Sequence, residues 1–72
     1  MDWESISANW QYYKSLAQLR WTKLTVQQVD LIAGRREAFV VHLSSLYGIS
    51  HDAAQMQLES WQGRLRAPAP WP

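Results

Sequence analysis

The sequence predicts an all-α protein, a small bundle of three to four short helices. All three prolines fall at positions 68, 70 and 72, so no proline interrupts a helix in the first 67 residues. The three glycines are well separated, at positions 34, 48 and 63, where each can end a helix. Apolar residues recur at spacings of three and four, and no stretch alternates with period two. These observations together favour helices and argue against strands.

Length and composition predict one folded domain with an aromatic core. A 72-residue chain buries only about 60% of the surface that it exposes when unfolded, so its stability needs support. Disulfides are excluded because the chain contains no cysteine. Five Trp, three Tyr and one Phe supply bulk instead, in a chain that is 47% hydrophobic. We expect residues 1–66 to form the helical domain and the Pro-rich residues 67–72 to form an extended tail.

The first predicted helix runs from Glu4 to Trp21. Asp2 and Glu4 lie at its positive dipole end, and Arg20 and Lys23 lie at its negative end. The apolar positions have helical spacing, which predicts one amphipathic stripe. That stripe consists of Ile6, Trp10, Tyr13, Ala17 and Trp21.

The second predicted helix begins at a well-defined boundary. Thr25 and Gln28 have the spacing of a capping box, in which each side chain accepts a hydrogen bond from the other residue's backbone N–H. Leu24 and Val29 occupy the two positions of a hydrophobic staple around this cap.

Gly34 can either end this second helix or lie inside a longer one. The apolar rhythm favours continuation, because it crosses the glycine without changing phase. The residues that keep it are Ile32, Arg36, Phe39, Leu43 and Leu46. We therefore expect a short helix from Val26 that bends near Gly34 into one running to Tyr47.

Gly48 and Ser50 predict the end of one helix and the start of the last. Gly48 suits the left-handed conformation of a helix C-terminus, and Ser50 is a preferred N-cap. In the tail, Trp71 could dock onto the domain or a partner, or remain disordered. The predicted core gathers the residues of the apolar stripes: Trp10, Tyr13, Ala17, Trp21, Leu24, Ile32, Phe39, Leu43, Tyr47, Leu58 and Trp61.

The residues do not assemble a recognisable active site. His42 and His51 lie on different helices, and neither has an acidic residue arranged to orient it as a catalytic base. Paired carboxylates for a dimetal site and a glycine-rich phosphate loop are both missing from the sequence. We therefore expect no enzymatic activity, no cofactor and no metal site.

Charge and hydropathy favour a cytoplasmic protein without a strong attraction to polyanions. The net charge is +1, whereas nucleic-acid binders concentrate a large excess of Lys and Arg on one face. Asp2 and Glu4 exclude a basic signal-peptide start, and no apolar run is long enough to span a membrane. An alternative is weak binding to nucleic acid or an anionic surface through Lys14, Arg20, Lys23, Arg35 and Arg36.

Four blocks of residues, in register, resemble the CsbD-like family of small bacterial proteins. They are Asn9-Trp10, Lys23-Leu24-Thr25, Gly34-Arg35-Arg36 and Tyr47-Gly48-Ile49-Ser50, and the resemblance extends over about residues 3–61. Single residues in register between these blocks are Lys14, Trp21, Ile32, Ala33, Leu43, Ala54 and Trp61. The resemblance implies a helical bundle, abundance under general stress and a molecular activity that the family does not define. It implies no catalytic residue.

The departures from the family pattern predict self-association. Leu16 and Leu19 stand where family members usually carry charged or small residues. With Tyr12 they form a second apolar stripe beside the core stripe of the first helix. A bundle this small has little room to bury two stripes, and an exposed one would favour a homodimer or another protein partner. The competing explanation is that these residues enlarge the intramolecular core.

Overall fold

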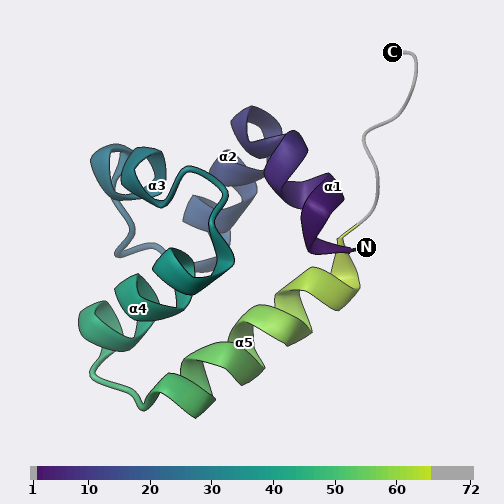
Figure 1. The fold of residues 1–72 in the computed structure, drawn as a ribbon. Helices are drawn as coiled ribbons and strands as arrows, with labels where there is room; N and C mark the ends of the chain where they lie inside the picture. Colours follow the sequence, from purple (N-terminus) through teal and green to yellow (C-terminus); the bar gives the residue numbers. More distant parts are fainter. Residues whose placement is uncertain (1, 66–72) are drawn as a thin grey trace.

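A computed structural model describes residues 2–65 as five α-helices, with no strand in that range. The prediction of an all-α bundle is therefore confirmed, and four of the five helices have seven or more residues. The predicted tail at 67–72, including Trp71, lies outside the described residues. Figure 1 shows the helices, which are α1 (Trp3–Ala8), α2 (Trp10–Arg20), α3 (Val26–Ile32), α4 (Arg36–Tyr47) and α5 (His51–Arg64).

The prediction of one helix from Glu4 to Trp21 was wrong, because the helix is interrupted at Asn9. The Asn9 backbone N–H is shared between the Ser5 and Ile6 carbonyls, and its Nδ2 donates to the Ser5 carbonyl at 2.9 Å. Asparagine competes in this way for helix carbonyls, which makes it a poor residue inside a helix. The break separates α1 from α2, although both contribute to the same apolar stripe.

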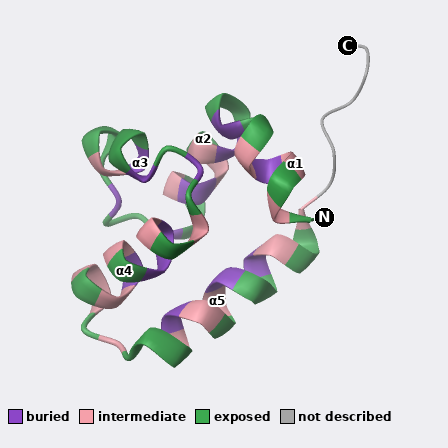
Figure 2. Cartoon of the chain, viewed as in Figure 1, coloured by how far each residue is buried: buried purple, intermediate pink, exposed green. Residues whose placement is uncertain are grey.

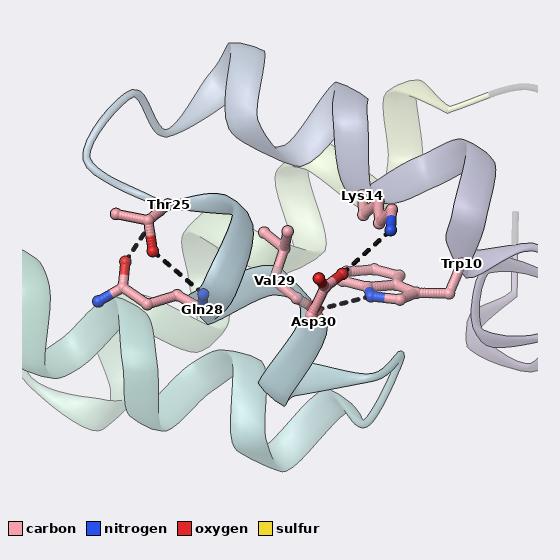
Figure 3. Close-up of polar contacts among 6 residues, drawn as sticks. All are labelled: Trp10, Lys14, Thr25, Gln28, Val29 and Asp30. Carbon is pink, nitrogen blue, oxygen red and sulfur yellow. Dashed lines mark hydrogen bonds and ion pairs between the residues drawn. The ribbon is translucent and has the colours of Figure 1, made fainter.

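The predicted start of α3 is confirmed in detail. The Thr25 hydroxyl accepts from the Gln28 N–H at 3.1 Å, and the Gln28 side chain accepts from the Thr25 N–H at 2.9 Å. Figure 3 shows this capping box at one end of α3 and the contacts from α2 at the other. Leu24 and Val29, the predicted staple pair, are both buried.

The predicted continuation through Gly34 was wrong, because α3 ends at Ile32 and a new helix begins at Arg36. Ala33 and Gly34 both adopt positive φ, 51° and 76°, which no continuing right-handed helix allows. The backbone of Gly34 lies so close to Ser7 of α1 that an added Cβ would stand 2.8 Å from the Ser7 hydroxyl. The apolar rhythm therefore continues across two separate helices that bury their residues in one core.

The predicted boundary between α4 and α5 is confirmed. Gly48 ends α4 with φ of 62°, and the Ser50 hydroxyl accepts from the Ala53 N–H at 3.0 Å. Figure 1 shows the short connection that turns α5 back beside α4.

The core lies where the inward faces of the five helices meet, as Figure 2 shows. Ten of the eleven predicted core residues are buried. Tyr47 is the exception, because it is only half-buried and its hydroxyl accepts from the Lys23 N–H. Four further residues complete the buried cluster: Ile6, Val29, Val40 and Ala54.

Phe39 lies at the centre of the aromatic core. Its ring meets those of Trp3, Trp10, Trp21 and Trp61 edge to face, with centroids 5.3 to 6.0 Å apart. This is the favoured geometry for aromatic pairs. Tryptophans from α1, α2 and α5, together with the one that follows α2, therefore converge on a single residue of α4.

Candidate interaction surfaces

The outer face of α2, formed by Tyr12, Leu16 and Leu19, is the most apolar part of that helix's surface. Leu19 is 77% exposed and Tyr12 is 49% exposed. Leu16 is half-buried and packs against the core. For this residue, the competing explanation that the second stripe enlarges the intramolecular core is therefore partly correct. At 100° per residue, this face points away from α3, which α2 contacts through Lys14 and Trp10.

The exposed side chains of α2 are uncharged until the helix ends. They are Gln11, Tyr12, Ser15 and Leu19, followed by Arg20 at the last residue. Each of the other four helices exposes at least one acidic side chain: Glu4, Asp30, Glu37, and, on α5, Asp52 and Glu59. The α2 outer face is therefore apolar without the charged groups that keep a helix surface solvated.

An open crevice of about 430 Å³ adjoins this face where α1 meets α2. Residues 7–12 line it, so Tyr12 belongs to both the crevice and the α2 outer face. The prediction of one continuous helix missed this crevice. Its signal in the sequence was Asn9, a residue that disfavours helix interiors.

The structure gives each of the five predicted anion-binding residues a partner within the chain. Lys14 forms an ion pair with Asp30 at 3.0 Å, shown in Figure 3, and Arg36 forms one with Glu59 at 3.5 Å. Arg35 donates to the carbonyls of Leu31 and Ile32 at the end of α3.

The remaining two cations lie over aromatic rings. The Arg20 guanidinium is 5.0 Å from the Trp21 ring centroid, and the Lys23 ammonium is 5.2 Å from that of Tyr47. Arg20 therefore stacks on a tryptophan of the core. The five cations are thus distributed over separate contacts rather than gathered at one site.

The two histidines do not form a common site. We expected neither histidine to have an acidic residue arranged to orient it, and this was wrong for His51, whose Nε2 lies 2.9 Å from the Glu37 carboxylate of α4 on the surface. His42 takes no part in this pair. Within residues 2–65, no three His, Asp or Glu side chains come together as metal ligands. No helix in the same range is long and apolar enough to cross a membrane.

The fold and its surfaces define the class, a small all-helical protein with an aromatic core and an uncharged apolar helix face. Comparison with known proteins then gives the family. The chain is 33% identical to a UPF0337 protein of Rhodopseudomonas palustris, over 92% of this chain and all of that protein. It is also 33% identical to a UPF0337 protein of Agrobacterium fabrum, over 89% of this chain and 96% of the relative.

The UPF0337 protein YjbJ of Escherichia coli O6:H1 is 30% identical over 89% of this chain and 93% of the relative. The chain belongs to the UPF0337 family. No family model and no solved structure matches it. The names of these relatives state a family but no enzymatic activity, substrate or partner.

Proposed function

We propose that this chain is a non-enzymatic accessory protein associated with bacterial stress, which acts by binding or self-association through the α2 outer face. The observation that carries the proposal is the exposure of Leu19 and Tyr12, 77% and 49%, on a face without charge before Arg20. Single exposed apolar residues are ordinary, but neighbouring ones on one helix face are typical of contact surfaces.

The resemblance to CsbD-like proteins supports the stress association. It also supports the interpretation of the α2 outer face as a contact surface. Those proteins usually carry charged or small residues at the positions of Leu16 and Leu19. Replacing charge by leucine on an exposed helix face lowers solubility, and a contact that covers the leucines offsets this cost. The bacterial relatives support the same setting.

Sedimentation equilibrium tests the contact. Between about 50 µM and 1 mM, where weak association is measurable, the wild-type chain is expected to dimerise and Leu16→Glu/Leu19→Glu is expected to stay monomeric. Because Leu16 packs partly against the core, Leu19→Glu is also tested alone, and it is expected to keep its fold since Leu19 is largely exposed. Leu31→Glu on α3 is the matched control, since Leu31 is also largely exposed. A dimer that survives both Leu19 variants would contradict the assignment to α2.

The stress association needs a separate measurement. The abundance of the protein in its native bacterium is expected to rise under general stress. Equal abundance in stressed and unstressed cells would remove this part of the proposal.

A further inference from the structure

The α2 outer face presents a similar pattern of apolar side chains in either direction along the helix axis. Tyr12 and Leu19 lie at its two ends, seven residues or about 10.5 Å apart along the helix, and Leu16 lies between them. Two copies of α2 that run antiparallel can therefore place Tyr12 of each beside Leu19 of the other. The twofold axis then passes between Ser15 and Leu16, so every contact occurs twice, as a symmetric dimer requires.

Charge distinguishes this arrangement from a parallel one. Arg20 is the one exposed charge of α2. A parallel pair would bring the two Arg20 side chains together, and like charges side by side are destabilising. The antiparallel pair sets Arg20 opposite the uncharged Gln11 and leaves no like-charge pair along the face.

Shape favours the same register. Tyr12 borders the open crevice of about 430 Å³ at the junction of α1 and α2. In the antiparallel register this crevice lies next to the partner's most exposed α2 side chain, Leu19. The crevice thus leaves space for a projecting leucine rather than forcing two convex helix surfaces together.

We propose that the partner of the α2 outer face is a second copy of this chain, docked antiparallel with Tyr12 of each copy against Leu19 of the other. This inference rests on the proposed function, because it names the partner of that face. The face offers on the order of a few hundred Å² per copy, below the roughly 800 Å² of a standard interface. The dimer therefore belongs to the weak, reversible class.

Cysteine cross-linking tests the register directly, since the chain has no cysteine of its own. Single cysteines are introduced at exposed positions by Ser15→Cys, Tyr12→Cys and Leu19→Cys, with Ser60→Cys on α5 as the matched exposed serine. A disulfide needs Cα atoms about 4.4–6.8 Å apart, so only residues that lie opposite each other can cross-link efficiently. Circular dichroism verifies that each variant keeps its helices.

Ser15→Cys lies beside the axis and is expected to form disulfide-linked dimers at least about tenfold faster than Ser60→Cys. Tyr12→Cys and Leu19→Cys are each expected to cross-link no faster than Ser60→Cys when alone. An equal mixture of the two is expected to form the mixed dimer rapidly, identified by its mass.

Two outcomes would overturn the inference: one contradicts only the antiparallel register, and the other contradicts self-association as well. If Tyr12→Cys and Leu19→Cys each cross-link to themselves as fast as Ser15→Cys, the pairing is parallel, and self-association stands without this register. If wild-type protein sediments as a monomer up to about 1 mM and no variant exceeds Ser60→Cys, a second copy is not the partner, and self-association through α2 fails with it.

Discussion

Three tryptophan side chains combine burial with directed hydrogen bonds to other segments. The indole N–H of Trp10 donates to the Val29 carbonyl at 2.8 Å, as Figure 3 shows, and that of Trp3 donates to the Gly34 carbonyl at 2.8 Å. Trp21 donates to the Gln57 side chain at 3.1 Å. Each ring therefore contributes apolar area without leaving its N–H unsatisfied, which would cost about 1–3 kcal/mol.

Removal of a core tryptophan is expected to unfold the protein at room temperature. Trp10→Ala and Trp61→Ala each cost roughly 3–5 kcal/mol. A single core of this size rarely supplies more than about 3–5 kcal/mol in total. Thermal melts followed by circular dichroism measure the effect. Trp10→Phe keeps most of the ring volume and is expected to remain folded with a lowered melting temperature. Cooperative melts within a few degrees of wild type for both alanine variants would contradict the core assignment.

The stabilisation that Asp2 provides at the start of α1 depends on pH. Its carboxylate accepts from the Ser5 backbone N–H at 2.9 Å, and this hydrogen bond lowers the pKa of Asp2 below its ordinary value. A lowered folded-state pKa means that the stabilisation is fully present above the ordinary carboxyl pKa of about 4. It is lost as the pH falls through the lower folded-state value.

The matched variant is Asp2→Asn, because asparagine caps helices about as well but does not titrate. Below about pH 4 the wild type is expected to lose stability relative to Asp2→Asn, while the difference between them stays constant at higher pH. Melting temperatures at a series of pH values measure this difference. A constant difference across the acid range would show that the Asp2 cap makes no pH-dependent contribution.

Among the elements, α3 depends on contacts from outside itself. Seven residues form too short a helix to be stable alone in water. The capping box gives backbone N–H groups at its start hydrogen-bond partners, while the Trp10 and Arg35 side chains donate to carbonyls in its last turns. The turn that follows is then closed against α1, where Gly34 packs directly on Ser7.

Gly34→Ala is expected to destabilise the protein more than Gly48→Ala. Both glycines have positive φ, 76° and 62°, so alanine costs about 1–2 kcal/mol at either position. At Gly34 the added methyl carbon also meets the Ser7 hydroxyl at 2.8 Å and the Ser7 backbone at 3.1 Å, whereas nothing lies within 4 Å at Gly48. This overlap adds about 1–3 kcal/mol.

Chemical denaturation of both variants measures the comparison. Ser7→Ala/Gly34→Ala removes the hydroxyl but leaves the close approach to the Ser7 backbone, so it is expected to recover only part of the lost stability. Equal losses for Gly34→Ala and Gly48→Ala would show that α1 yields to the added methyl group without cost.

In the molecule as a whole, three basic residues connect elements. Lys14 joins α2 to α3, and Arg36 joins α4 to α5. Lys23 connects the segment after α2 to Tyr47 of α4. Residues 1–36 contain five basic and three acidic residues, a net charge of only +2.

We therefore expect no detectable binding to duplex DNA at about 50 mM salt. Five phosphate contacts would make the affinity fall with a log–log slope near −0.9 per contact as salt rises. A fluorescence titration with labelled DNA at low and physiological salt measures this. Binding at low salt that weakens with this slope, and that Arg35→Ala/Arg36→Ala reduces, would support the anionic-surface alternative instead.

Local patterns in the sequence were sufficient for the all-helical class, for several helix ends and for most of the core. The capping box at Thr25, the glycine stop at Gly48 and the N-cap at Ser50 are each complete within a few residues. The core could be predicted from the phase of the apolar stripes, since a buried stripe needs only the helical repeat. The same spacing identified Tyr12, Leu16 and Leu19 as a second stripe.

Only the tertiary structure decided where helices break and how far each side of α2 is covered. The break at Asn9 and the reversal at Ala33 and Gly34 bring α1 against the α3–α4 turn, where Trp3 and Ser7 meet partners about thirty residues away in sequence. No local pattern contains those partners, and the apolar rhythm is unchanged by the breaks because both helices face one core. Likewise, helical spacing places Leu16 and Leu19 on one stripe, but the packing of neighbouring elements half-buries Leu16 and leaves Leu19 exposed.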